Sequence, residues 1–198
     1  METYVGLAAE ILARPARLGG TRLVAVDGPS GAGKTDFARR LARALGDPPI
    51  VHTDDLLDGW DDQFTFWTRL DELVLAPLRR GRPGRYRRYS WVRQEFLQRR
   101  IEVPVTPVLI VEGVSAARAT IRRELTLAAY VTAPADLRLA RTVARDGESV
   151  RPHLDAWRRA EDLHFAADAT ADQADLLIDG APGVVYDQET EYVRLDEP

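Results

Sequence analysis

The sequence contains no cysteine, and it has no long apolar run over its 198 residues. Without cysteine the chain cannot form a disulfide, use thiolate catalysis or bind a metal through sulfur. The N-terminal segment carries Glu2 and Glu10 among apolar residues at helical spacing, which predicts an amphipathic helix rather than a signal peptide. No segment is apolar enough to span a membrane. We therefore expect no membrane association and a cytoplasmic location.

A strong excess of either charge is also missing, because 29% of the residues are charged and the net charge is -4. A general nucleic-acid binder is more often basic overall, so this balance argues against a nucleic-acid partner. Hydrophobic residues make up 45% of the sequence, which is enough for one compact domain with a full core. We expect residues 1–198 to form a single domain.

Short apolar runs alternate with helical patterns along most of the chain. The runs that predict strands lie at residues 22–26, 49–53, 107–113, 127–132 and 174–179. Apolar spacing predicts helices at residues 35–45 and 134–146. Strands that alternate with helices are typical of a parallel sheet covered by helices on both faces. The sequence thus predicts an α/β fold of three layers around a parallel, five-stranded sheet.

Residues 28–35 read GPSGAGKT and follow the first predicted strand directly. Their spacing is that of a phosphate-binding loop, G-x-x-x-x-G-K-[ST], which indicates a P-loop NTPase fold. Glycines let backbone N–H groups turn around a phosphate chain, and the following helix adds its positive end. Lys34 is expected to bind the β- and γ-phosphates, and the Thr35 hydroxyl to bind Mg²⁺. The residues expected to bind ATP are Gly28, Ser30, Gly31, Ala32, Gly33, Lys34, Thr35 and Asp36.

Acidic residues stand at the ends of two other predicted strands. Asp54 and Asp55 follow the second strand, and Glu112 and Gly113 end the third. Ligands of open α/β sheets bind at the carboxyl ends of the strands. We interpret Asp54 as the base that takes the proton of a substrate hydroxyl. Asp54 and Glu112 are expected to lie near the substrate and Mg²⁺. Gly113 is expected to let the phosphoryl acceptor approach the backbone closely. A helix N-cap is the alternative for either aspartate, and a structural partner is the alternative for Glu112.

The predicted helix at residues 134–146 carries Arg138, Arg141 and Arg145 on one face. Such a helix is suited to closing over ATP and stabilising charge on a transferred phosphoryl group. The next segment, residues 145–153, is predicted to be a small lid. A solvated basic face is the alternative for any single arginine, but we expect at least one of the set to be catalytic.

Residues 60–105 interrupt the alternation of strands and helices and centre on RRGRPGRYRRYSW. Arginines between aromatic residues suit single-stranded nucleic acid, a solvated flap, or a pocket for an anionic or aromatic substrate. We favour the pocket, because the family resemblance given below implies that acceptors bind at this place. In this acceptor-binding insert, Tyr89 and Trp91 are expected to form walls and Arg87 to contact the substrate.

The order of motifs along the chain resembles the uridine kinase family of P-loop nucleoside kinases, and it is similar to phosphoribulokinase and pantothenate kinase. The segments that carry the resemblance, between residues 21 and 180, are GPSGAGKT, HTDD, VLIVEGV, RLARTVARD and ADLLIDG. The resemblance implies Asp54 as general base, and Thr35 and Glu112 near Mg²⁺. It further implies that Arg141 and Arg145 lie close to the phosphates. Members of this family often form oligomers, so the resemblance leaves a homo-oligomer open.

The chain departs from the family pattern on the acceptor side, where Leu56 and Leu57 stand in place of an aromatic pair. The sequence therefore predicts an ATP-dependent small-molecule kinase, with ATP and Mg²⁺ as cofactors and a hydroxyl-bearing small molecule as partner. The acceptor stays open among nucleosides, nucleotides, sugar acids, pantothenate and antibiotics. The alternative is a P-loop ATP-binding regulatory protein with slow ATPase activity and a protein or nucleic-acid partner.

Overall fold

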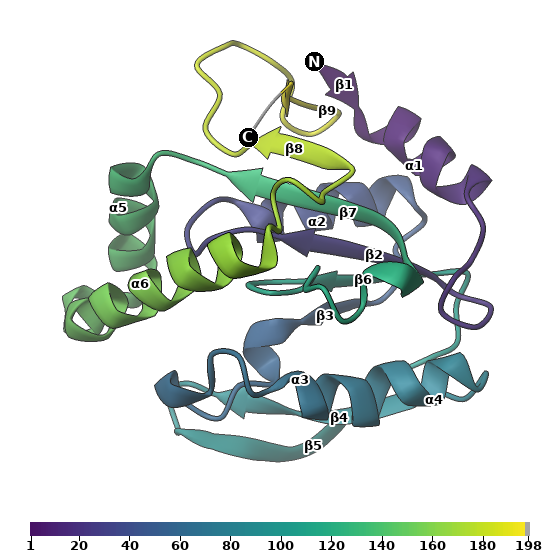
Figure 1. Cartoon of the computed structure of the whole chain (residues 1–198), viewed down its shortest axis with the longest axis horizontal. Helices are drawn as coiled ribbons and strands as arrows, with labels where there is room; N and C mark the ends of the chain where they lie inside the picture. Colours follow the sequence, from purple (N-terminus) through teal and green to yellow (C-terminus); the bar gives the residue numbers. More distant parts are fainter. Residues whose placement is uncertain (197–198) are drawn as a thin grey trace.

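A computed structural model describes residues 1–196, and a six-stranded sheet of order β10-β8-β7-β2-β6-β3 lies at its centre (Figure 1). Its five parallel strands are β2 (Arg22–Asp27), β3 (Ile50–His52), β6 (Val108–Glu112), β7 (Leu125–Thr132) and β8 (Leu176–Asp179). All five lie where the sequence predicts strands. The α/β class is therefore confirmed.

The predicted number of strands is wrong by one. β10 (Arg194–Leu195) pairs antiparallel with β8 and adds a sixth strand at that edge. The same tail pairs through β9 (Glu191–Tyr192) with β1 (Glu2–Thr3) at the start of the chain. These strands are two residues long, too short for an alternating pattern that reveals a strand in the sequence. β10 covers an edge of β8 that otherwise has unpaired backbone groups.

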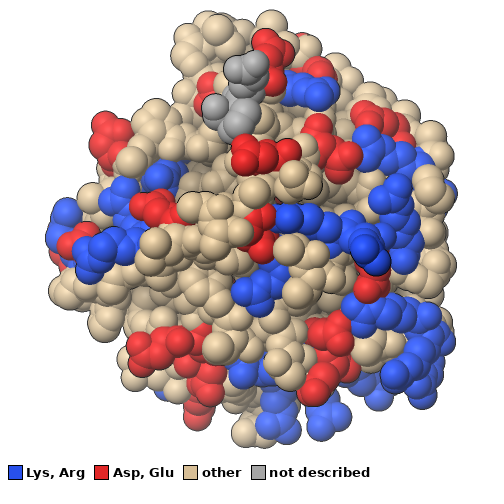
Figure 2. All heavy atoms as spheres, viewed as in Figure 1, with Lys and Arg blue, Asp and Glu red and all other residues tan. Residues whose placement is uncertain are grey.

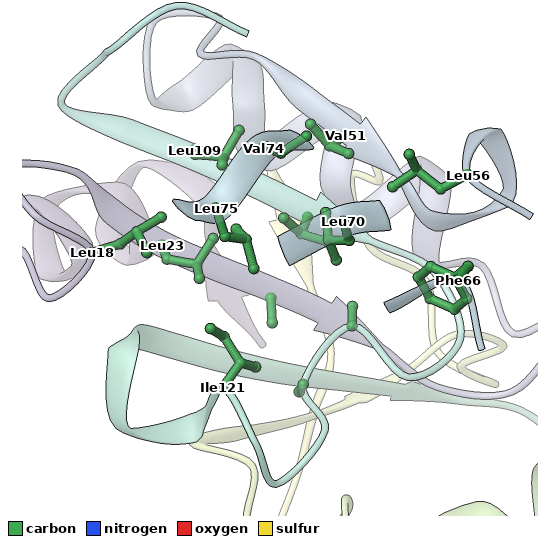
Figure 3. Packing of buried hydrophobic residues seen from close by; sticks show 14 of the residues in the cluster. Leu18, Leu23, Val51, Leu56, Phe66, Leu70, Val74, Leu75, Leu109 and Ile121 are labelled. Carbon is green, nitrogen blue, oxygen red and sulfur yellow. The ribbon is translucent and has the colours of Figure 1, made fainter. Parts of the chain in front are cut away.

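Side chains of the central strands point alternately into two hydrophobic cores, one on each face of the sheet. Val24 and Val26 face α1 (Tyr4–Ala13) and α2 (Lys34–Ala44), whose Ile11 and Leu41 are completely buried. Leu23 and Leu109 face the opposite core. Figure 3 shows this second core, in which Leu70, Leu75 and Phe66 come from the segment after β3. The three-layer arrangement explains why the strand sequences are almost continuously apolar.

The insert at residues 60–105 forms part of the second layer and then extends as a hairpin. Its helical part comprises η2 (Trp60–Asp62), α3 (Trp67–Leu70), a π-helical turn η3 (Asp71–Leu75) and α4 (Ala76–Arg79). The hairpin pairs β4 (Gly84–Ser90) with β5 (Glu95–Val103), on the far side of α3 and α4 from the sheet (Figure 1). Buried apolar side chains anchor the helical part, so the insert is not simply a solvated flap.

The segment after β7 forms α5 (Ala135–Asp146), a turn η5 (Glu148–Val150) and the long helix α6 (Arg151–Asp168). α5 and α6 lie beside the carboxyl ends of β2 and β7 (Figure 1). Two further short turns are η1 (Thr53–Asp55), after β3, and η4 (Arg122–Glu124), before β7. Between residues 1 and 196, no helix has the length and apolar character needed to cross a membrane.

Candidate active site

The loop between β2 and α2 bends through three glycines with positive φ. The angle is 136° at Gly28, 77° at Gly31 and 104° at Gly33. A Cβ at Gly28 would lie 2.1 Å from the Val131 carbonyl oxygen, and one at Gly31 would lie 2.3 Å from that of Arg138. Glycine is thus needed both for the turn and for the close approach of β7 and α5. The loop has the shape that the sequence motif predicts.

The N-terminus of α2 is open toward this loop. Gly33 occupies the N-cap position without a side-chain cap, and the helix begins at Lys34. The first N–H groups of a helix have no acceptor within the helix, so those of Lys34, Thr35 and Asp36 are suited to bind an anion. Lys34, the single lysine of the sequence, is nearly buried, and its Nζ donates a hydrogen bond to the Pro29 oxygen at 2.9 Å. The Ala32 methyl is buried in the core, so Ala32 offers only its backbone.

Asp27, to which the sequence assigns no role, fixes the start of the loop. Its buried carboxylate accepts hydrogen bonds from the backbone N–H groups of Gly28 at 2.7 Å and of Ser115 and Ala117 at 2.8 Å. Burial raises the pKa of Asp27 to about 6, although these N–H groups and the nearby Lys34 act to lower it. One side chain therefore joins the loop to the segment that follows β6.

Two residues predicted near the metal, Thr35 and Glu112, lie in contact at one edge of the sheet. Thr35 Oγ1 donates a hydrogen bond to Glu112 Oε1 at 3.1 Å, and His52 Nδ1 lies 2.5 Å from the same oxygen. Burial acts to raise the pKa of Glu112, but the His52 hydrogen bond and Lys34 outweigh it, so the pKa falls below its usual value. The Glu112 hydrogen bond raises the pKa of His52. A short hydrogen bond thus joins His52 and Glu112 beside the loop.

Asp54 lies in η1, directly after β3, and its side chain is exposed. Desolvation by the surrounding protein, and then the charge of Glu112, raise the pKa of Asp54. Lys34 and Arg145 oppose this shift, so both cations lie within electrostatic reach. The N-cap position of η1 is His52, which excludes an N-cap role for either aspartate in this turn.

Asp55 connects this edge to the insert. Its carboxylate accepts a hydrogen bond from the Tyr86 hydroxyl at 3.3 Å and pairs with Arg88 Nε at 3.2 Å. Burial raises the pKa of Asp55, while His52 and Arg88 act to lower it. On the other side of this edge, a Cβ at Gly113 would lie 1.8 Å from Thr53 Oγ1. The expectation that Gly113 makes room for an acceptor is therefore wrong, because Thr53 already fills that space.

The donor atoms at this edge suit a magnesium ion that is shared with phosphates. Residues 1–196 contain no group of three His, Cys, Asp or Glu side chains that could hold a metal by itself. Magnesium in phosphoryl-transfer sites needs only one or two protein carboxylates, because phosphates and water complete its shell. The Thr35 hydroxyl and the Glu112 carboxylate are hard oxygen donors in contact with each other, and Asp54 lies near them.

The three arginines of α5 point to different places. Arg141 donates to the Gly180 oxygen at 3.1 Å and to the Gly31 oxygen of the loop at 3.3 Å. Arg145 pairs with Asp146 at 2.7 Å, and its charge opposes the upward shift in the pKa of Asp54. Arg138 Nε donates to the Ala133 oxygen at the start of its own helix, at 3.0 Å. Arg141 and Arg145 are therefore the members of the set that reach the site.

The hairpin brings only part of its predicted wall to the site. Trp91 is partly exposed, and its Nε1 donates to the backbone oxygen of Asp54 at 3.3 Å, whereas Tyr89 is buried behind it. Arg87 is exposed and lies opposite Arg100 in the register of β4 and β5. Figure 2 shows basic side chains, with some acidic ones, along the lower edge of this face, where Figure 1 draws the hairpin. Arg88 rather than Arg87 contacts an acid of the site.

A cavity of about 630 Å³ lies beside the phosphate loop and has no counterpart in the motifs. Gly33 and Asp36 at the start of α2 line it, as do Leu137 and Arg141 of α5. Another part of its wall comes from the segment after β8, which includes Val184, Val185 and Tyr186. No role for this segment was predicted from the sequence.

Comparisons with known proteins show the family and the fold of this chain. A model of the family described as "Phosphoribulokinase / Uridine kinase family" matches residues 61–184. Inorganic pyrophosphatase TTM1 of Arabidopsis thaliana is 31% identical over 136 residues, which is 64% of this chain and 21% of that protein. Uridine-cytidine kinase C of Dictyostelium discoideum is 26% identical over 137 residues, 65% of this chain and 30% of that protein. The chain thus spans less than a third of either relative.

Solved structures show the same fold. A structure described as a possible uridine kinase from Bacillus stearothermophilus superposes with a TM-score of 0.65 at 18% identity, covering 88% of this chain and 96% of the other. Shikimate kinase from Bacteroides thetaiotaomicron gives a TM-score of 0.50 at 15% identity, covering 80% and 86% of the two chains. At such identities the likeness concerns the fold.

Proposed function

Because the chain belongs to the phosphoribulokinase and uridine kinase family, we propose that it transfers the γ-phosphoryl group of ATP to a hydroxyl group of a small molecule. One observation carries the proposal. The phosphate loop and the Asp54 turn meet at one edge of the sheet, because Glu112 contacts both Thr35, at the start of α2, and His52, two residues before Asp54. A phosphate-binding lysine, a lid arginine and a proton acceptor at one edge are the parts that phosphoryl transfer requires.

In the proposed reaction the loop and Lys34 hold the phosphates of ATP. The acceptor oxygen forms a bond to the γ-phosphorus, and the bond from that phosphorus to the bridging oxygen of ADP breaks. The proton of the acceptor hydroxyl passes to Asp54, which lies directly after β3 at the carboxyl edge of the sheet. Arg141 and Arg145 stabilise charge on the phosphoryl group as it moves.

Mg²⁺, when bound, neutralises charge on the β- and γ-phosphates. Thr35 and Glu112 are the residues that would hold it, with Asp54 close by. The hydrogen bond with His52 acts to lower the pKa of Glu112, which favours the ionised carboxylate that a metal ligand needs. The same hydrogen bond fixes the orientation of that carboxylate.

We assign the cavity beside the loop to the base and ribose of ATP. Its volume of about 630 Å³ lies within the range of sites for small ligands. It opens next to Gly33, where the first N–H groups of α2 would bind the phosphates, and apolar side chains of Leu137 and Val184 line it. The acceptor would then enter from the opposite side of Asp54, where Trp91, Asp55 and Arg88 lie. Arg88 favours an acceptor that carries a negative charge.

Release of ADP from ATP and Mg²⁺ tests this proposal. The rate is measured without an acceptor and then with nucleosides, sugars, sugar acids and vitamins. We expect one class to raise the rate strongly, and Asp54→Asn to remove about 10²- to 10⁴-fold of that rise while ADP affinity stays the same. Full transfer activity in Asp54→Asn would contradict the proposed base. A slow rate that no acceptor changes would favour the regulatory alternative.

A further inference from the structure

A carboxylate of α6 binds the phosphate loop from inside the protein. Glu161 is completely buried, and its two oxygens lie 3.1 and 3.2 Å from the backbone nitrogen of Ser30, which donates to them. The Ser30 hydroxyl donates a second hydrogen bond to the same carboxylate. Neither the motif nor the proposed reaction uses Glu161. In the sequence, 131 positions separate it from Ser30, which it contacts.

Trp157 lies one helical turn before Glu161 and completes the arrangement. Its indole Nε1 donates to Glu161 Oε1 at 2.8 Å and lies 3.2 Å from Ser30 Oγ. A buried carboxylate is stable only while its donors remain in place, and each donor would lose its partner if the carboxylate moved. The position of Ser30 is therefore tied to that of α6.

The opposite side of Trp157 faces the aromatic residues near Asp54. The Trp157 ring packs edge-on against Trp60, with centroids 5.4 Å apart and planes at 89°. Trp60 stacks on His153 at the start of α6, with centroids 5.0 Å apart, and lies 5.1 Å from Trp91. Trp91 in turn donates its indole N–H to the Asp54 backbone oxygen. A continuous set of contacts thus joins the loop to the acceptor side.

We infer that Glu161 is a positioning residue that holds the phosphate loop through Ser30 and, through Trp157, couples nucleotide binding to the aromatic residues beside Asp54. A phosphate chain that enters the loop changes the surroundings of Ser30, and this change reaches Trp157 because both donate to one carboxylate. The coupling is reciprocal, as any linkage of two binding equilibria must be. The inference rests on the proposed nucleotide site but does not need transfer to an acceptor.

Binding of ADP with Mg²⁺, measured by calorimetry, tests the first half of this inference. Glu161→Ala should weaken ADP binding at least tenfold. Glu161→Gln should weaken it less, because its amide oxygen can still accept from the Ser30 N–H. Asp162→Asn removes an exposed carboxylate next to Glu161 and should leave the Kd within twofold of wild type. Thermal unfolding without nucleotide shows which variants are folded. If Glu161→Ala does not fold, the ADP affinity of Glu161→Gln is the result that tests the inference.

Tryptophan fluorescence tests the second half and reports something that loss of stability alone does not. ADP should change the emission of the wild type and of Trp67→Phe. The change should disappear in Trp157→Phe, and it should be reduced in Glu161→Gln at saturating ADP.

Two results would overturn this inference and leave the proposed nucleotide site standing. One is ADP binding within twofold of wild type in both Glu161 variants, and the other is an emission change that survives in Trp157→Phe. If the wild type bound no ADP, the nucleotide site and this inference would both fall.

Discussion

The phosphate loop and the insert at residues 60–105 meet at Asp54, but they are built in different ways. Backbone groups shape the loop, and glycines allow β7 and α5 to approach it closely. Side chains shape the acceptor side, where Trp91 and Arg88 reach over from a hairpin. A backbone site tolerates few residue types and so leaves a motif in the sequence, whereas a side-chain site changes with each new substrate.

The family match sharpens this contrast. It covers residues 61–184 and thus begins after the phosphate loop. The family assignment therefore rests on the insert, β6 and the helices α5 and α6. These segments carry no motif as specific as the phosphate loop. The fold is shared with the solved structures described above, even where the acceptor residues depart from the family pattern.

Loss of Lys34 should have the largest effect on the loop side of the comparison. Lys34→Ala removes the ammonium group that we propose binds the phosphates, and we expect kcat/KM for transfer to fall about 10²- to 10³-fold. Arg39→Ala, which removes an exposed cation from the same helix, should change it less than twofold. Since Lys34 is the single lysine, an amine-selective reagent should modify it, and ATP should protect it. Labelling that ATP does not slow would argue against phosphate binding at this residue.

Gly180→Ala should break the packing that holds the loop from the side of β8. A Cβ there would lie 1.8 Å from the Ala32 oxygen and 3.0 Å from the Thr132 oxygen. Relieving such contacts means moving backbone, and we expect the free energy of unfolding in urea to fall by about 3 kcal/mol. Gly183→Ala is the matched control, because no atom lies within 4 Å of its Cβ position. Equal stability of the two variants would show that the backbone around Gly180 moves at a lower cost in free energy than its close contacts indicate.

Asp27 should make the loop side sensitive to pH. Its pKa is about 6 in the folded protein against 3.8 for an ordinary aspartate, so the folded state binds the proton more tightly. The resulting stabilisation is complete below pH 3.8 and is lost as the pH rises through 6, by about 3 kcal/mol in total. Asp27→Asn does not titrate at this position. The unfolding free energy of wild type minus that of the variant should therefore fall from pH 4 to pH 8, and a rise would contradict the shift.

The smallest effect should come from the insert, where two neighbouring arginines form a natural pair of variants. Arg88→Gln removes the cation that contacts Asp55, and we expect the KM of an anionic acceptor to rise about tenfold. Arg87→Gln removes a cation that faces Arg100 across the hairpin and should raise it less than twofold. Equal effects of the two variants would mean that the hairpin attracts the acceptor through its overall positive charge and not through a specific contact of Arg88.

Much of the fold could be predicted from the sequence, because buried parallel strands have an unmistakable composition. The run at 107–113 appears as β6, whose five residues are all buried. β9 and β10 could not be predicted, since a two-residue strand has no periodicity and depends on a partner far along the chain.

The site divides in the same way. Gly28, Lys34 and Thr35 follow a fixed spacing and could be identified, whereas Asp27 and Glu161 are ordinary acids until folding buries them beside the loop. The prediction for Gly113 was wrong because a glycine at a strand end can make room either for a ligand or for a neighbouring side chain. Only the structure shows that the Thr53 side chain occupies the space where a Cβ of residue 113 would lie. Arg88 could not be told from Arg87, because an irregularity in the register between residues 87 and 89 decides which one reaches Asp55.

The fate of the γ-phosphoryl group tests the central claim most directly. ATP labelled at the γ-position is incubated with Mg²⁺, the protein and the acceptor that raises ADP release most, and the label is then followed. The account predicts that the label appears on the acceptor in step with ADP, and that Asp54→Asn loses this transfer. Label that appears only as inorganic phosphate, at a rate no acceptor changes, would contradict it and identify a hydrolase.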